Sequence, residues 1–199
     1  MQNRHHINLI TALPAEAKPL IQGLGLKRLQ PVGPVPIYTA PGVHLAVSGP
    51  GVAAMATGVA HLHAMAPTGI ATGWLNVGVC GHGSLDLGEA LLANKVIELN
   101  GHSWELKTPG DTPLQNSPIT CVSRPQAVYA PHMAYDMESA GFVASVTRFA
   151  SLNSISVLKI VSDNPEHGVE KINAKRVREL VARHVDHISD MMRRLPLND

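Results

Sequence analysis

The sequence has few aromatic residues, few cysteines and no long apolar run. Only 4% of the 199 residues are aromatic, so a core has to be built from Ala, Val, Leu, Ile and Met. Cys80 and Cys121 are too few for a disulfide framework, and they lack the spacing of a metal site. No stretch approaches the roughly 20 apolar residues of a membrane span. These absences argue against a disulfide-stapled module and against a membrane-spanning protein.

An excess of charge is absent as well. The formal net charge is +1, and no block of Lys and Arg precedes the C-terminal segment, so nothing indicates binding to nucleic acid. The apolar run within residues 1–16 is too short for the hydrophobic part of a signal peptide and is typical of a first strand. With 45% hydrophobic residues, the chain suits a single domain, 1–199, in a soluble cytoplasmic protein.

Apolar runs of strand length alternate with segments of helical composition. The expected strands are 5–12, 35–39, 43–48, 70–79, 90–99, 119–123 and 156–162. Helices are expected from Pro14, after Gly51, over 137–150 and over 168–195, and residues 100–117 are expected to form a loop or short hairpin. This alternation predicts an α/β domain of three layers, in which helices flank a mixed central β-sheet. The strand runs are continuously apolar, as expected when helices cover both faces.

Glycine-rich and polar groups stand where several of these strands should end. In open α/β sheets, ligands gather at the carboxyl ends of the strands, so these groups are candidates for a binding site. Ser48-Gly49-Pro50-Gly51 leads into a helix, whose first N–H groups favour anions or hydroxyls. Such a turn also allows a strand and a helix to pack closely, and for the turn taken alone that simpler explanation is favoured.

Three carboxylates follow apolar runs that should form neighbouring strands: Glu16, Glu138 and Asp163. Taken singly, Glu138 and Asp163 are explained as capping or salt-bridged acids. Taken together, the three match the needs of cleaving a bond to a sugar carbon. The transition state of that reaction resembles an oxocarbenium cation, and one acid must protonate the leaving group while another prepares the nucleophile.

The eleven histidines do not form a metal-binding motif. His61 and His63 are two residues apart and point to different faces of a helix. His184 and His187 share a face, but no third ligand accompanies them. The sequence therefore predicts neither a metal site nor a cofactor.

Five segments resemble the superfamily of nucleoside phosphorylases and methylthioadenosine/S-adenosylhomocysteine nucleosidases, in the order that the family shows. They are ITALPAEAKPL, VSGPGVAAMATG, LNVGVCGHGSLDLGEALL, AYDMESAGFV and VLKIVSDNPE. The resemblance implies an enzyme that cleaves the N-ribosidic bond of a purine-type nucleoside, either an N-glycosyl hydrolase or a phosphorylase. It also implies a homodimer, because members often complete the pocket across a subunit interface.

The resemblance implies a role for each matched residue. Asp163 would protonate the leaving base, and Glu16 would activate water. Glu138 would hold the ribose hydroxyls, Met137 would pack on the sugar, and Asp136 is expected to be peripheral. Lys159 stands where hydrolytic members often carry an arginine. The other positions expected to bind substrate, water or phosphate are Ser48, Gly49, Gly51, Asn76, Val77, Gly78 and Ser162.

Water is favoured over phosphate as the nucleophile. Phosphorolysis needs cations to hold the phosphate dianion, and phosphorylases of the family carry an arginine where this chain has Asn76. His82 and Lys159 are the remaining sources of positive charge. A phosphorylase of the hopanoid-associated or purine nucleoside type therefore stays an alternative, as do a futalosine hydrolase-like enzyme and a non-catalytic nucleoside-binding relative.

The chain is short between the expected strand 119–123 and AYDMES, where nucleosidases carry an aromatic residue that stacks on the purine. Arg124, Tyr129 and His132 are the candidates left for contact with the base. The resemblance therefore does not identify a residue that stacks on the base.

Overall fold

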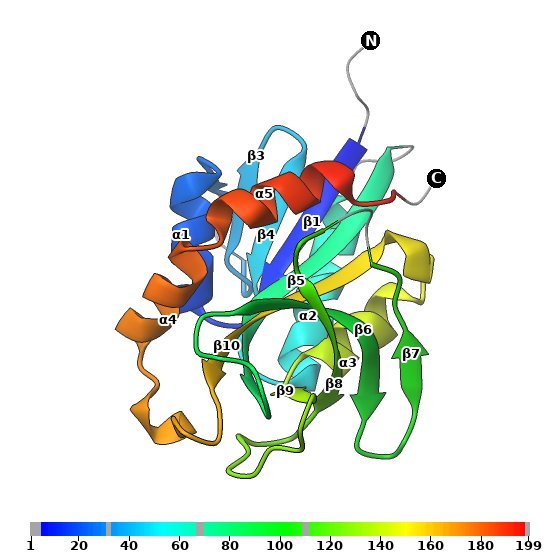
Figure 1. Ribbon diagram of the computed structural model, residues 1–199. Helices are drawn as coiled ribbons and strands as arrows, with labels where there is room; N and C mark the ends of the chain where they lie inside the picture. Colours follow the sequence, from blue (N-terminus) through cyan, green and yellow to red (C-terminus); the bar gives the residue numbers. More distant parts are fainter. Residues whose placement is uncertain (1–4, 31–32, 67–69, 109–111, 198–199) are drawn as a thin grey trace.

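Ten strands form one sheet in the described part of the computed structural model, residues 5–30, 33–66, 70–108 and 112–197 (Figure 1). They are β1 (His5–Thr11), β2 (Lys27–Arg28), β3 (Ile37–Ala40), β4 (Val43–Val47), β5 (Ala71–His82), β6 (Ala90–Glu98), β7 (Ser103–Glu105), β8 (Gln115–Cys121), β9 (Ala134–Asp136) and β10 (Ile155–Asp163). β1 lies parallel to β4 and β5, whereas β3 is antiparallel to β4 and β6 to β10. The sheet is therefore mixed, as predicted.

Five of the strands close into a ring at one end of the sheet. β10 pairs with both β5 and β6, β6 pairs with β8, and β9 joins β8 to β5. In this ring Gly81 of β5 is paired with Tyr135 of β9 on one side and with Asp163 of β10 on the other. Residues from three distant parts of the sequence thus meet where β5 and β10 end.

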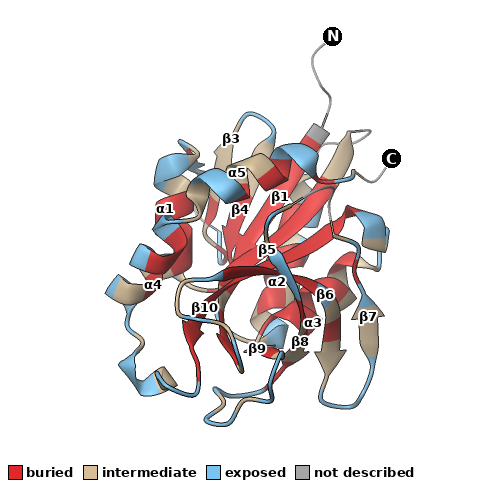
Figure 2. Cartoon of the chain, viewed as in Figure 1, coloured by how far each residue is buried: buried red, intermediate tan, exposed pale blue. Residues whose placement is uncertain are grey.

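Helices cover both faces of the sheet, so the predicted three-layer α/β fold is confirmed (Figure 1). On one face α2 (Val52–Met65) and α3 (Ser139–Val146) bury Met55, Leu62 and Phe142 against the sheet. On the other face α1 (Pro14–Gly23), α4 (Ala174–Ala182) and α5 (Val185–Arg194) bury Leu20 and Leu180. Figure 2 shows that burial is continuous along the central strands, which explains their uninterrupted apolar runs.

Each expected strand is present, with shifted bounds. β5 continues to His82, and β8 begins at Gln115, inside the segment expected to form a loop or hairpin. β7 forms a hairpin with β6 in that segment. The short strands β2 and β9 carry no apolar pattern of their own and are not predicted by the sequence. Their strand conformation comes from pairing with longer neighbours.

The C-terminal segment 168–195 is predicted to be one helix, but the structure divides it. A 3-10 turn, η2 (Val169–Lys171), precedes α4, and the chain turns again before α5. His184 lies at this second turn, with its Nε2 atom 2.7 Å from the carbonyl oxygen of Gly88. The apolar stripe is buried on both helices, so the helical periodicity is correct and the break comes from a tertiary contact.

The helix expected over 137–150 is shorter than predicted, because α3 begins only at Ser139 and ends at Val146. A 3-10 turn, η1 (Leu152–Ser154), follows it. Met137 and Glu138 therefore precede the helix and lie near its N-terminus. None of the helices in the described ranges has the length and apolar character needed to cross a bilayer.

Candidate active site

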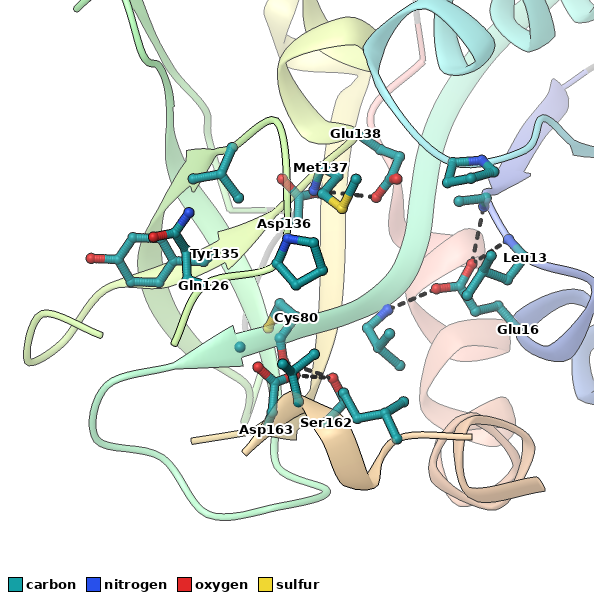
Figure 3. A pocket seen from close by; sticks show the side chains of 18 of the residues that line it. Leu13, Glu16, Cys80, Gln126, Tyr135, Asp136, Met137, Glu138, Ser162 and Asp163 are labelled. Atoms are coloured by element: carbon teal, nitrogen blue, oxygen red, sulfur yellow. Dashed lines mark hydrogen bonds between the residues drawn. The ribbon is translucent and has the colours of Figure 1, made fainter. Parts of the chain in front are cut away.

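A cavity of about 320 Å³ opens at the carboxyl ends of the central strands (Figure 3). Its wall includes Glu16 from α1, Glu138 from the start of α3 and Asp163 from the end of β10. Met137 and Ser162 also line it. The three acids that are far apart in the sequence thus face one hollow, and Figure 3 shows them on different sides of it.

Backbone N–H groups hold the carboxylate of Glu16. Its Oε2 accepts hydrogen bonds from the N–H groups of Ala12 (3.0 Å) and Leu13 (2.8 Å), and its Oε1 accepts one from Val79 (3.0 Å). Burial raises the pKa of Glu16, while Lys159 and the N–H donors act in the opposite direction. A fixed carboxyl with a raised pKa is suited to accept a proton from a nucleophile.

Glu138 is bound by the glycine-rich turn that the sequence singled out. Its Oε1 accepts the N–H of Gly51 at 2.8 Å, and its Oε2 accepts the N–H of Met137 at 3.3 Å. Gly51 has φ of 90°, a conformation that favours glycine, and it precedes the first turn of α2. The turn therefore offers its N–H to an anion as expected, but that anion is Glu138. Burial raises the pKa of Glu138, and Lys159 opposes this shift.

Ser48, Gly49 and Gly51 of this turn are not among the residues that line the cavity. The hydroxyl of Ser48 is 2.8 Å from the carbonyl oxygen of Gly49 and 3.2 Å from that of Thr11. Pro50 provides the contact of the turn with the cavity instead.

Asp163 has a hydrogen-bond donor at each carboxylate oxygen. The hydroxyl of Ser162 donates to Oδ1 at 2.6 Å, and the hydroxyl of Tyr129 donates to Oδ2. Ser162 also lies 3.2 Å from the carbonyl oxygen of Cys80. The Asp163 residue is 6% exposed, so these donors and the cavity make up most of its surroundings.

The expectation that Asp136 is peripheral is wrong. Its carboxylate is buried and forms an ion pair with Lys159, with Nζ 2.8 Å from Oδ2. The N–H and hydroxyl of Ser139 also donate to it, at 2.9 and 2.6 Å. A buried carboxylate needs this compensation, and its cationic part comes from a tertiary neighbour on β10.

Lys159 lies behind the cavity wall rather than in it. Its side chain is 1% exposed, and in the sheet it is paired with Gly78. A Cβ atom on Gly78 would lie 3.2 Å from the Lys159 Nζ and 3.0 Å from Glu16 Oε1, so the glycine leaves room for both groups. Burial acts to lower the pKa of Lys159, but Asp136, Glu138 and Glu16 raise it above its usual value. Lys159 is thus a permanent cation among three acids.

Asn76 and Val77 are fully buried in β5 and are not among the cavity-lining residues. The side-chain amide of Asn76 donates to the carbonyl oxygen of Ile10 at 3.2 Å, which ties β5 to β1. Val77 packs in the core beneath α1, α4 and α5. Asn76, Val77 and Gly78 thus lie beneath the site. Contact between these residues and the substrate remains a prediction.

Two tyrosines line the cavity near Asp163. The ring centroids of Tyr129 and Tyr135 are 5.7 Å apart in an edge-on arrangement. The sequence indicated Tyr129 as a candidate for contact with the base, whereas Arg124 and His132 are exposed and do not line the cavity. Tyr135 was missed, although its position beside Asp136 is a signal that could have identified it.

No family model and no curated protein sequence matches the chain. Solved structures show that its fold is that of a class of nucleosidases. A 5′-methylthioadenosine/S-adenosylhomocysteine nucleosidase from Helicobacter pylori has a TM-score of 0.75 at 15% identity, over 95% of this chain and 98% of that chain.

Two further structures have the same fold. The 5′-methylthioadenosine nucleosidase of Arabidopsis thaliana has a TM-score of 0.75 at 16% identity and covers 96% of each chain. The futalosine hydrolase of Helicobacter pylori has a TM-score of 0.72 at 15% identity, over 96% of this chain and 98% of that chain. The fold that the sequence motifs implied is therefore confirmed.

Proposed function

We propose that this protein is an N-glycosyl hydrolase that cleaves the N-ribosidic bond of a purine-type nucleoside. The observation that carries the proposal is the meeting of Glu16, Glu138 and Asp163 at one cavity of about 320 Å³. A hollow of this size is within the range of small-molecule sites. The shared fold with nucleosidases and a futalosine hydrolase supports the same reaction class.

The proposed reaction uses two of the acids for proton transfer. Asp163 donates a proton to a ring nitrogen of the base, and the bond from C1′ to the base breaks with its electron pair on the base. A water molecule then forms a bond from its oxygen to C1′ and gives a proton to Glu16. Release of this proton to solvent and reprotonation of Asp163 complete the cycle, so water is added across the broken bond.

The ribose is proposed to lie between these two groups. Glu138 accepts hydrogen bonds from the ribose hydroxyls, and Met137 packs against the sugar. Together, the Glu16 and Glu138 carboxylates offer negative charge to a sugar that becomes cationic in the transition state. Tyr129 and Tyr135 supply aromatic surface at the Asp163 side, where the base would lie.

Water is the proposed nucleophile because the cavity has no cationic wall. Among the described residues that line it, none is Lys, Arg or His. The nearby cation, Lys159, is paired with Asp136 and stands among carboxylates that repel a phosphate dianion. Phosphorolysis is the alternative that this charge distribution disfavours.

The direct test is release of free base by the purified protein. Methylthioadenosine, adenosylhomocysteine, inosine and futalosine are each incubated with it, with and without phosphate. We expect release from at least one of them at a rate that does not depend on phosphate. Strict dependence on phosphate would assign a phosphorylase, and binding without release would assign a non-catalytic relative.

Asp163→Asn tests the assignment of the acid. The amide keeps the size of the side chain but cannot protonate the base, so kcat should fall by about 10²–10⁴-fold. The melting temperature reports whether the fold is kept. Asp186→Asn on the exposed side of α5 is the matched control and should retain full activity. A fully active Asp163→Asn variant would remove Asp163 from the mechanism.

We also propose that the protein forms a homodimer and is cytoplasmic, and that phosphate is not its co-substrate. The homodimer is inferred from the family resemblance. A single species with the mass of one chain, measured by light scattering at micromolar concentration, would contradict it.

A further inference from the structure

Tyr129 contacts the proposed acid, yet the reaction described above gives it no part in the proton transfer. Its hydroxyl donates to Asp163 Oδ2, while the hydroxyl of Ser162 occupies Oδ1. Ser162 is the sequence neighbour of Asp163 and therefore always lies near it. Tyr129 comes from the connecting segment 122–133, between β8 and β9, and is 34 residues away from Asp163 in the sequence. The contact therefore depends on how that segment folds.

Two glycines of β5 and its following turn make room for the connecting segment. A Cβ atom on Gly81 would lie 2.4 Å from Tyr129 Cε1 and 2.6 Å from Asp163 Oδ2. A Cβ atom on Gly83 would lie 1.9 Å from the carbonyl oxygen of Ala130. Real Cβ atoms do not approach other atoms this closely, so neither position accepts a side chain while the segment stays in place. The ring of Tyr129 thus lies on bare backbone beside Asp163.

Hydrogen bonds hold the residues that follow Tyr129 in the same segment. The N–H of Ala130 donates to the hydroxyl of Tyr135 at 3.1 Å, and the N–H of His132 donates to the hydroxyl of Ser84 at 3.0 Å. These bonds tie the segment to β9 and to the turn after β5. The position of the Tyr129 hydroxyl is therefore set by the fold around it.

The phenol of Tyr129 is a lasting donor. Burial raises its pKa above the usual value, and the hydrogen bond to Asp163 and the charge of that carboxylate raise it further. A protonated phenol beside a carboxylate oxygen donates its hydrogen to that oxygen. Hydrogen bonds to an ionised acceptor are about twice as strong as neutral ones.

We propose that Tyr129 is a positioning residue for departure of the base, holding the Asp163 carboxyl in place and staying bound to the carboxylate that proton transfer leaves behind. This inference rests on the proposed function. Asp163 gives its own proton to the base nitrogen, and Tyr129 keeps its proton throughout. The contribution of Tyr129 to the rate is largest when the leaving group needs a proton, and it disappears when the leaving group departs as a stable anion.

Tyr129→Phe removes the donor and keeps the ring. It is compared with wild type on two substrates: whichever of the four nucleosides wild type cleaves fastest, and 4-nitrophenyl β-D-ribofuranoside, whose leaving group departs without protonation. On the nucleoside we expect kcat to fall about 10- to 100-fold, as for loss of one hydrogen bond to a charged group, with KM changed less than about threefold. On the nitrophenyl riboside kcat should stay within about threefold of wild type.

Two further variants complete the test. Tyr38→Phe makes the same chemical change on β3, outside the cavity, and should alter neither rate. Gly83→Ala keeps the tyrosine but displaces the connecting segment, so it should reproduce the selective loss on the nucleoside. It serves as the deciding variant if the melting temperature shows that Tyr129→Phe does not fold.

Other outcomes overturn the inference. Equal losses on both substrates would show that Tyr129 acts only in packing, and a lower KM with unchanged kcat would show that it obstructs the cavity. If wild type releases no base from any nucleoside, the proposed function fails and this inference fails with it. If Asp163→Asn loses activity while Tyr129→Phe matches wild type, this inference alone fails.

Discussion

At the scale of single residues, the charge of Lys159 allows the acids around it to lie together out of water. These acids are Asp136, Glu138 and Glu16. Asp136 is in direct contact with Lys159, and Glu138 and Glu16 contribute to the raised pKa of its ammonium group. Moving an isolated carboxylate into the interior costs several kcal/mol, and a nearby cation offsets part of that cost. Lys159 therefore influences the site without lining the cavity, because its positive charge offsets the negative charges of these carboxylates.

Lys159→Met and Asp136→Asn test this balance. Removing one partner leaves the other buried and unpaired, so each change should lower the free energy of unfolding by about 3–5 kcal/mol. In the double variant neither charge remains, and the loss should be smaller than the sum of the single losses. Urea denaturation of the four proteins measures these values. Additive losses would mean that the two side chains do not stabilise each other.

At the scale of elements, the site depends on how closely α3 approaches α2. A Cβ atom on Gly141 of α3 would lie 2.5 Å from the carbonyl oxygen of Val52, the first residue of α2. The preceding residue, Gly51, donates the N–H that holds Glu138. The contact between the helices thus fixes the distance between the glycine-rich turn and the acid proposed to bind ribose.

Gly141→Ala is predicted to be destabilising in spite of helix propensity. In an exposed helix the change from Gly to Ala stabilises by about 1 kcal/mol. Here the backbone of Val52 is in the way, and overpacking typically costs about 1–3 kcal/mol. The melting temperature should fall, and KM for the nucleoside should rise as Glu138 loses its partner. Ser145→Ala, on the half-buried side of α3, is the control and should leave KM unchanged.

At the scale of the whole molecule, a buried histidine, His6, lies on the sheet beside the half-buried His44. His6 of β1 is 4% exposed, its Nε2 is 3.1 Å from Asn8 Oδ1, and its ring centroid is 4.3 Å from that of His44 on β4. Burial, and then the charge of His44, lower the pKa of His6 from 6.5 to about 4, against the effect of Asn8. The folded protein therefore holds His6 neutral where an unfolded chain would protonate it.

The stability of the fold should reflect this difference. Between pH 6.5 and about 4 the unfolded chain binds a proton that folded His6 does not bind, so stability falls as the pH falls through this window. The loss amounts to at most about 3 kcal/mol. Because burial raises the pKa of Glu16 and Glu138, those groups act in the opposite direction in acid. The difference in the free energy of unfolding between wild type and His6→Gln therefore isolates the contribution of His6.

Urea denaturation of wild type and His6→Gln across this pH range measures the difference. The difference in the free energy of unfolding between the two proteins should change toward low pH, because wild type loses more stability than His6→Gln. His187→Gln, at an exposed position on α5, controls for the loss of a histidine and should follow wild type. Parallel curves for wild type and His6→Gln would show that burial does not hold His6 neutral.

The longer strands, most helices, and Glu16 and Asp163 could be predicted because local patterns encode them. Continuous apolar runs mark strands covered on both faces, and the stripe in 168–195 marks helix even where the chain turns. Glu16 and Asp163 each follow such a run, so their place at the strand ends is a local property, whereas Glu138 follows β9. β9 and the turn at His184 could not be predicted, because pairing partners and the carbonyl of Gly88 define them.

The sequence was sufficient to predict the α/β layers and to place Glu16 and Asp163 at the ends of strands, because periodicity and local composition suffice for both. The tertiary structure alone decided which groups the acids contact. Gly51 meets Glu138 across 87 residues, Lys159 neutralises Asp136 across two strands, and Tyr129 meets Asp163 from an irregular segment. A hydrogen bond or ion pair depends on positions in space, and residues far apart in the chain take those positions only when the sheet closes.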